Sequence, residues 1–198
     1  MRLPVMEQFY TIQGEGKFTG HAAYFIRLAG CDVGCVWCDV KDSWDAEGYP
    51  THTPEELALE ASKHPCNIVV ITGGEPAMYD LTGLTSALKA QGKQVHIETS
   101  GAHPIRGQFD WITFSPKKFK SPVPESASMA HELKVIVFNK SDFDWAMSFQ
   151  KEVPDTCLLY LQPEWSNREQ MHPRIVDFVL LNPDWNIGLQ THKYLGVD

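Results

Sequence analysis

Seven short apolar runs recur along the 198 residues, and they constrain the fold more than any other feature. The runs are rich in Val, Ile and aromatic residues and are almost continuously apolar, which is typical of strands buried on both faces of a parallel sheet. They span residues 23–28, 67–72, 94–99, 111–115, 133–138, 158–162 and 185–190. Helix-like stretches lie between several of them, at residues 53–64, 80–90, 142–150 and 167–181.

Strands that alternate with helices predict a parallel sheet with right-handed crossovers. We expect an α/β fold in which about six parallel strands form a partial, open β/α barrel, because a full eight-unit barrel typically needs ~250 residues. No repeat or linker interrupts residues 1–198, so we expect a single domain. In such a fold the ligand site lies at the carboxyl ends of the strands.

Two helix boundaries can also be predicted. Thr53, Pro54 and Glu56 have the residue types and spacing of a capped helix N-terminus. Pro173 lies within the last helix-like stretch, where we expect a kink or a late start because proline lacks the backbone N–H.

Composition and charge narrow the class of protein. A hydrophobic content of 43% supplies enough material for a folded core. A net charge of −8 argues against a bulk electrostatic contact with nucleic acid. No apolar run approaches the ~20 residues of a membrane span, and the first residues lack the apolar core of a signal peptide. We therefore expect a cytoplasmic protein with neither a nucleic-acid nor a membrane partner.

Three of the five cysteines form a CxxxCxxC triplet directly after the first predicted strand, at Cys31, Cys35 and Cys38. Such spacing can bring three thiolates to one face of a metal cluster. A cubane iron–sulfur cluster needs four ligands, so three cysteines leave one iron open to another molecule. A zinc-stabilised binding module is an alternative, although no nearby residue completes a familiar zinc pattern. Cys66 and Cys157 are expected to be buried, apolar thiols.

Polar motifs also follow the next three predicted strands. Two glycines after the second strand allow a backbone to approach a ligand closely, and the glutamate beside them can accept a hydrogen bond from an ammonium group. A hydroxyl and a cation after the fourth strand can bind a carboxylate or an adenine edge. Each motif alone could be an ordinary turn or solvated loop. The candidates at this edge are Thr72, Gly73, Gly74, Glu75, Glu98, Ser100, Ser115, Pro116 and Lys117.

Three further features suggest a small acidic ligand. In the glycine-rich stretch 11–16, Gln13 and Glu15 offer donors and acceptors that suit the amino and lactam groups of a pterin-like edge. Arg27 lies in an apolar strand and needs an anionic partner, which could be a ligand carboxylate or an acid of the core. The stretch 190–196, which contains His192, follows the last strand and could close over the site.

A CxxxCxxC triplet after the first strand of a partial α/β barrel resembles the signature of radical S-adenosylmethionine (radical SAM) enzymes. The resemblance implies that the three cysteines hold a 4Fe-4S cluster, whose open iron binds SAM. An electron from the cluster then cleaves SAM into methionine and a 5′-deoxyadenosyl radical. The implied cofactor-binding residues are Trp37, Asp39, Gly73, Gly74, Glu75, Glu98, Ser100, Ser115, Pro116 and Lys117.

Within that superfamily, motifs over nearly the whole chain are similar to those of one family, among them YTIQGEG, TGGEP, SPK and QTHKYLG. The family contracts the ring of 6-carboxy-5,6,7,8-tetrahydropterin to 7-carboxy-7-deazaguanine and releases ammonia, in 7-deazapurine and queuosine biosynthesis. The resemblance implies that SAM is regenerated, that a flavodoxin or ferredoxin is the reductant, and that the protein is a homodimer. It implies substrate contacts by Ile12, Gln13, Gly14, Glu15, Arg27, Thr72 and His192.

One position departs from that family. Its members carry a threonine that ligates Mg²⁺ where this chain has Val40. Because valine has no side-chain oxygen and Mg²⁺ requires oxygen ligands, we expect a weaker dependence on Mg²⁺. The main alternative within the superfamily is an activase that makes a glycyl radical on a partner enzyme. Gln13, Glu15 and Arg27 suit a pterin acid and have no evident use in such an activase.

Overall fold

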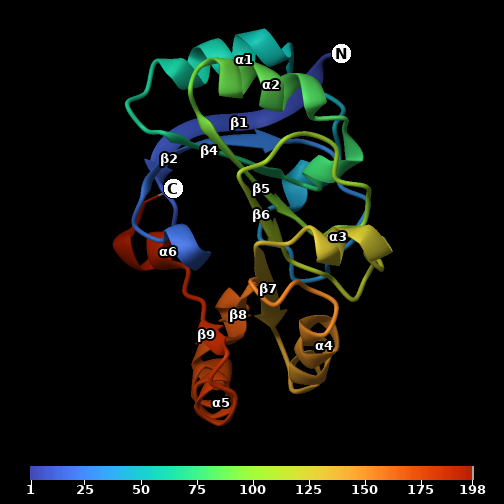
Figure 1. Ribbon diagram of the computed structural model, residues 1–198, viewed down its shortest axis with the longest axis vertical. Coiled ribbons are helices and arrows are strands. Elements are labelled where there is room, and N and C mark those ends of the chain that lie inside the picture. The colour runs from blue at the N-terminus through green and yellow to red at the C-terminus, as the bar shows by residue number, and fades with distance from the viewer. Residues whose placement is uncertain (198) are drawn as a thin grey trace.

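The computed structural model describes residues 1–197, and nine strands in that range form one open sheet (Figure 1). The spatial order is β3-β1-β2-β4-β5-β6-β7-β8-β9. In this order, β2 and all the strands that follow it run parallel to one another. The predicted open, mostly parallel sheet is confirmed, with one parallel strand more than the six expected. The parallel strands are β2 (Ala22–Leu28), β4 (Ile68–Gly73), β5 (Gln94–Thr99), β6 (Trp111–Phe114), β7 (Glu132–Val137), β8 (Leu158–Pro163) and β9 (Trp185–Ile187).

The two strands that the apolar runs did not predict are both antiparallel. β1 (Leu3–Ile12) pairs with β2, and the two-residue β3 (Thr51–His52) pairs with β1. β1 is half-exposed along most of its length and mixes polar with apolar residues, so it lacks the continuous apolar pattern of the buried strands. Because Ile12 lies opposite Ala22, the carboxyl end of β1 brings the stretch 12–16 to the amino-terminal edge of the parallel strands, whereas the cysteine triplet follows the carboxyl end of β2.

The helices lie between the strands largely as predicted: α1 (Pro54–Ser62), α2 (Thr82–Ala90), α4 (Ser141–Gln150) and α5 (Arg168–Leu181). The predicted cap of α1 is confirmed, because Glu56 N donates to Thr53 Oγ1 at 3.2 Å and Thr53 N donates to Glu56 Oε2 at 2.8 Å. Of the two outcomes expected at Pro173, the late start of α5 is wrong, and the kink stays a prediction. The helix begins at Arg168 and includes Pro173 as its sixth residue, where the proline removes one backbone N–H donor. Two five-residue helices, α3 (Pro124–Ser128) and α6 (Thr191–Leu195), were not predicted.

The helices cover the outer face of the sheet with two apolar layers. One layer packs α1 and α2 against β2, β4 and β5, and the other packs α4 and α5 against β7, β8 and β9 (Figure 1). Cys66 belongs to the first layer and Cys157 to the second, which confirms that both are buried apolar thiols. Among the described residues, no helix combines the length and the apolar character that a membrane crossing requires.

Alternation along the strands assigns the remaining side chains to the inner face. Ile26 and Leu28 of β2 belong to the outer layers, as do Val95 and Ile97 of β5. The residues between them therefore point inward. Arg27, Glu98, Lys134 and Gln162 are among the polar residues that this places on the inner face, and all four line the same cavity.

Candidate active site

A cavity of about 280 Å³ opens at the carboxyl ends of the parallel strands. Residues of β2, β4, β5, β7 and β8 line it, together with the cysteine loop and the segments 12–15 and 190–192. All but one of the residues predicted for the site reach its wall. These are Ile12, Gln13, Gly14, Glu15, Arg27, Cys31, Cys35, Trp37, Cys38, Asp39, Val40, Thr72, Gly73, Gly74, Glu75, Glu98, Ser100, Ser115, Lys117 and His192. Pro116 instead lines a neighbouring pocket that shares Trp37 and Lys117.

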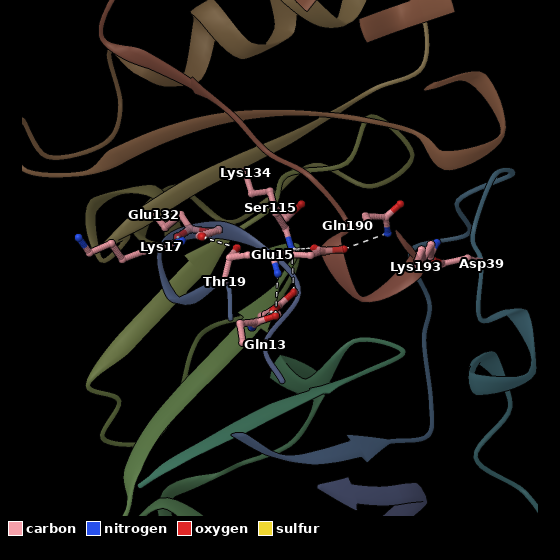
Figure 2. Close-up of polar contacts among 12 residues, drawn as sticks. Gln13, Glu15, Lys17, Thr19, Asp39, Ser115, Glu132, Lys134, Gln190 and Lys193 are labelled. Atoms are coloured by element: carbon pink, nitrogen blue, oxygen red, sulfur yellow. Dashed lines mark hydrogen bonds and ion pairs between the residues drawn. The ribbon is translucent and has the colours of Figure 1, made fainter. Parts of the chain in front are cut away.

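The open side of the barrel is bridged by chain segments that are far apart in sequence. Glu15 lies between Lys134 of β7 and Gln190, which precedes α6 (Figure 2). Thr191 N donates to Gly14 O at 2.9 Å. A Cβ atom at Gly14 would lie 2.0 Å from Nδ1 of His192, so this contact requires glycine. The segment 190–196 therefore closes over the site, as its place in the sequence suggested.

A buried charge network forms the floor of the cavity. Lys134 Nζ lies 2.8 Å from Glu98 Oε2 and also binds Glu15, while Gln13 Nε2 donates to Glu98 Oε1 at 2.9 Å. Burial alone would raise the pKa of Glu15, but attraction to Lys134 and hydrogen bonds from Lys134 and Gln190 lower it to about 2. The two carboxylates likewise raise the pKa of Lys134 against the effect of burial. The network is therefore charged at neutral pH.

These contacts occupy the side chains that we predicted to recognise a pterin edge. Gln13 Oε1 accepts from Glu15 N at 3.1 Å, so both ends of the Gln13 carboxamide bind protein atoms. Glu15 accepts from Lys134 and from Gln190 Nε2, the latter at 2.9 Å. A carboxylate has further lone pairs, so contact between Glu15 and a ligand stays a prediction.

Glu75 ties the glycine turn after β4 to the end of β5. Its carboxylate accepts from Ser100 N at 2.8 Å, from Ala77 N at 3.0 Å, and from the hydroxyls of Thr99 and Ser100. Only 1% of Glu75 is exposed. The side chain predicted to meet an ammonium group thus also holds two cavity-lining loops together.

The cysteine loop packs directly on that turn. A Cβ atom at Gly74 would lie 2.7 Å from Cβ of Cys31 and 2.4 Å from Gly30 O, so only glycine allows this approach. Cys31, Cys35 and Cys38 form a small cluster with Val33, Trp37 and Ala102 beside the cavity. Burial raises the pKa of Cys35 to about 11, and metal binding must therefore displace its proton.

The donor set fits an iron–sulfur cluster better than a single metal ion. Within residues 1–197 no three His, Cys, Asp or Glu side chains converge closely enough to hold one ion, as a structural zinc site would require. In a 4Fe-4S cluster each cysteine binds a different iron, so the thiols need only surround the same space. Three thiols on one cavity-lining loop meet that requirement.

Arg27 reaches the cavity from the carboxyl end of β2 and has a protein partner. Its Nε donates to Glu7 Oε1 at 2.6 Å. Glu7 lies on β1, directly opposite Arg27 in the strand register, and 46% of its side chain is exposed. The partner is therefore a surface acid rather than the core acid considered as the alternative. Pairing through Nε leaves the planar fork of the guanidinium able to meet a carboxylate.

Lys117 and Ser115 form a second polar group beside the cysteine loop. Lys117 Nζ donates to Ser115 O at 2.6 Å and to Ser115 Oγ at 2.5 Å, and it lies 5.9 Å from the centre of the Trp37 ring. Burial lowers the pKa of Lys117 to about 8. The hydroxyl, the cation and the indole predicted to contact a cofactor thus come together at one wall.

The structure offers no side-chain oxygen at Val40. The Val40 carbonyl accepts from Ser43 N and Oγ, at 3.1 and 2.6 Å, and the neighbouring Asp39 pairs with Lys193 at 3.0 Å. Mg²⁺ prefers octahedral oxygen coordination. The residues present do not fit the magnesium site that the resemblance implies, and we assign no step to that ion.

Lys134 and Gln162 are among the polar cavity residues that the sequence did not single out. Both are buried and lie on strands, within the runs ELKVIV and LLYLQP. The signal that singled out Arg27, a polar residue inside an apolar strand, applies equally to Lys134.

Comparison with known proteins agrees with this geometry. The radical SAM superfamily matches residues 25–117. A 7-carboxy-7-deazaguanine synthase from Flavobacterium psychrophilum is 55% identical over 98% of this chain and 92% of its own length. One from Synechocystis sp. is 48% identical over 98% of this chain and 93% of its own length.

The chain belongs to the 7-carboxy-7-deazaguanine synthase family. The crystal structure of QueE from Escherichia coli has the same fold, with a TM-score of 0.87 and 32% identity over 97% of this chain and 95% of that one. Members of the synthase family are radical SAM lyases, so a 4Fe-4S cluster and SAM are the cofactors of this chain. These relatives favour the synthase interpretation over a glycyl-radical activase.

Proposed function

We propose that this enzyme converts 6-carboxy-5,6,7,8-tetrahydropterin into 7-carboxy-7-deazaguanine. Loss of one ammonia from the pterin acid gives the composition of the product, so the reaction needs no net oxidant and SAM can be regenerated. The observation that carries the proposal is that Arg27 and the cysteine loop line one cavity. An anion-binding group and a cluster-binding loop are thereby offered to the same ligand.

The protein's own residues bind, orient and enclose the substrate. Arg27 holds its carboxylate, with Thr72, His192 and the segment 12–15 around the ring system. Cys31, Cys35 and Cys38 would hold the cluster, which together with SAM would supply a carbon radical able to remove a hydrogen atom from C6. The loop 12–15 and α6 exclude water from that radical, and holding C6 in one position lowers the entropic barrier.

Other properties belong to the same proposal. We infer that Trp37, Asp39, Gly73, Gly74, Glu98, Ser100, Ser115 and Lys117 contact SAM.

A one-electron reductant of the flavodoxin or ferredoxin class is needed to start the reaction. We further propose that residues 1–198 act as one domain, and that the enzyme is a cytoplasmic homodimer.

An anaerobic assay tests the proposal. The iron-loaded enzyme is incubated with SAM, dithionite and the tetrahydropterin acid, and the ultraviolet spectrum of the product and the released ammonia are followed. We expect equal amounts of 7-carboxy-7-deazaguanine and ammonia. A pterin that returns unchanged while SAM is cleaved would refute the proposal.

Matched cysteine variants provide the control for that assay. Cys31→Ser should lose both iron and turnover, because it removes one of three ligands of the cluster. Cys157→Ser lies in the outer apolar layer and should retain both. Iron content and the band near ~400 nm report cluster loading independently of turnover.

A further inference from the structure

The cysteine loop, residues 31–38, has few polar contacts with the rest of the fold. At its start Cys31 N donates to Trp44 O at 3.0 Å, and at its end Cys38 N donates to Cys35 O, also at 3.0 Å. Of the side chains at positions 32–37, Asp32 alone forms hydrogen bonds with another segment among residues 1–197. The loop must nevertheless present three cysteines to one cluster.

Asp32 is held by side chains from two other loops. Its Oδ2 atom lies 2.5 Å from Lys120 Nζ, and both of its carboxylate oxygens lie 3.0 Å from His103 Nε2. Lys120 Nζ is 3.1 Å from the same histidine nitrogen. His103 follows β5 and Lys120 follows β6, whereas Asp32 follows β2. The carboxylate therefore ties the cysteine loop to the ends of two further strands.

Apolar contacts join the same three loops. Ala102, next to His103, belongs to the small cluster that the cysteines form. Phe119 meets the Trp37 ring edge-on, with 5.9 Å between the ring centres. The loop after β6 thus contacts the cysteine loop at both Asp32 and Trp37, near its two ends.

Global stability does not explain these polar contacts. The side chains of Asp32, Lys120 and His103 are 41%, 33% and 26% exposed, and ion pairs at such positions contribute little to the folded state. Their place suggests a local role, because Asp32 directly follows the cluster ligand Cys31. Residues that orient metal ligands strongly affect metal affinity, and nearby net charge affects the reduction potential of an iron–sulfur cluster.

We propose that Lys120 is a positioning residue for the cluster. Its ammonium group, together with His103, holds Asp32 and thereby keeps the cysteine loop in the form that binds iron. The same cation offsets the negative charge beside Cys31, so the cluster accepts an electron more readily. The inference depends on the 4Fe-4S cluster and not on the identity of the substrate, and in this it goes beyond the proposed function.

The first test compares Lys120→Met with Lys118→Met. Lys118 lies two positions away and pairs with Asp142 at 2.7 Å instead, which makes it the matched control. A chelator should remove iron from the reconstituted Lys120→Met enzyme about tenfold faster than from the wild type. Lys118→Met should release iron at the wild-type rate, and Lys120→Arg, which keeps the cation, should restore most of the retention.

Metal-free protein provides a readout that does not involve the cluster. Amide hydrogen exchange in the peptide that covers residues 31–38 should be faster in Lys120→Met than in the wild type, because the carboxylate is no longer held. Tm should change little, since the ion pair is exposed. A marked fall in Tm for Lys120→Met would show that the lysine supports the whole fold, and would overturn the inference.

A redox titration followed by electron paramagnetic resonance tests the role of charge. The potential of the cluster should become more negative in Lys120→Met, because the charge of Asp32 is no longer offset. The double variant Asp32→Asn/Lys120→Met removes both charges, so its potential should return toward that of the wild type while its iron release stays fast. Equal potentials in the wild type and Lys120→Met would overturn the charge role.

Equal rates of iron release and of hydrogen exchange in Lys120→Met and the wild type would overturn the positioning role. None of these measurements uses the pterin acid. Their failure would leave the proposed reaction untouched, and failure of the proposed reaction would leave the role of Lys120 to be judged by iron release and potential alone.

Discussion

Nζ of Lys134 on β7 lies 2.8 Å from Oε2 of Glu98 on β5, across the intervening strand β6. The same ammonium group binds Glu15, which belongs to the segment that follows β1. One buried cation thus joins the middle of the sheet to the loop that closes the cavity. Buried ion pairs thus connect the segments at the floor of the active site, whereas apolar packing connects the helices to the outer face of the sheet.

Lys134→Met should destabilise the enzyme strongly. The substitution leaves Glu15 and Glu98 buried without their cation, and breaking a buried ion pair typically costs about 3–5 kcal/mol. Urea unfolding of the metal-free protein measures the loss. Lys140→Met, at an exposed lysine, should change the free energy of unfolding by less than about 0.5 kcal/mol. Equal effects of the two substitutions would contradict the assigned role of the network.

Stability should fall between pH 6.5 and pH 5 because of His96. Burial lowers its pKa from 6.5 to about 4, although Asp110 and Glu98 act in the opposite direction. A histidine that is neutral in the folded state stabilises it fully above the unfolded pKa, and this contribution is lost as the pH falls toward the folded pKa. The full effect is at most about 3 kcal/mol.

The variant His96→Met tests that assignment. Urea unfolding at several pH values should give a flatter profile between pH 6.5 and pH 5 than for the wild type. Glu15 does not confuse the comparison, because its contribution begins to fall only near its unfolded pKa of 4.5. Identical slopes for variant and wild type would show that another group titrates in this range.

Arg27→Ala should weaken binding of the pterin acid by about 2–5 kcal/mol, the effect of removing one partner of a buried charge pair. Cleavage of SAM in the absence of substrate should persist, because the cysteine loop is untouched. Glu7→Gln removes only the half-exposed partner of Arg27 and should not weaken pterin binding. Unchanged substrate affinity in Arg27→Ala would exclude Arg27 as the carboxylate-binding residue.

The wild-type enzyme should respond weakly to Mg²⁺, and Val40→Thr should strengthen the response. The substitution introduces a hydroxyl oxygen at a cavity-lining position that has none. Titration of pterin affinity with Mg²⁺, with and without a chelator, measures the difference. Strict dependence of the wild type on micromolar Mg²⁺ would show that other oxygen atoms complete the site.

Most of the parallel sheet could be predicted from sequence because most of its strands, such as β4 and β6, are largely buried on both faces and therefore almost continuously apolar. β1 escaped prediction because it is largely half-exposed and carries polar residues such as Glu7 and Gln8. The cap of α1 could be predicted because it depends on residues only three positions apart.

The candidate site was predictable as a set of residues but less so as a set of contacts. The cysteines and the glycine turn have characteristic local spacings, and the parallel topology brings them to one edge. The pairing of Glu15 with Lys134 joins residues 119 positions apart, and that of Arg27 with Glu7 requires the register of an unpredicted strand. Such contacts depend on how distant segments fold together.

The central claim is that one cavity holds both SAM and a pterin acid. An anaerobic crystal structure of the iron-loaded enzyme, grown with SAM and 6-carboxy-5,6,7,8-tetrahydropterin, tests it most directly. We predict a 4Fe-4S cluster on Cys31, Cys35 and Cys38, with SAM beside it and the pterin carboxylate within hydrogen-bond distance of Arg27. A pterin bound outside this cavity, or a carboxylate that does not contact Arg27, would contradict the account.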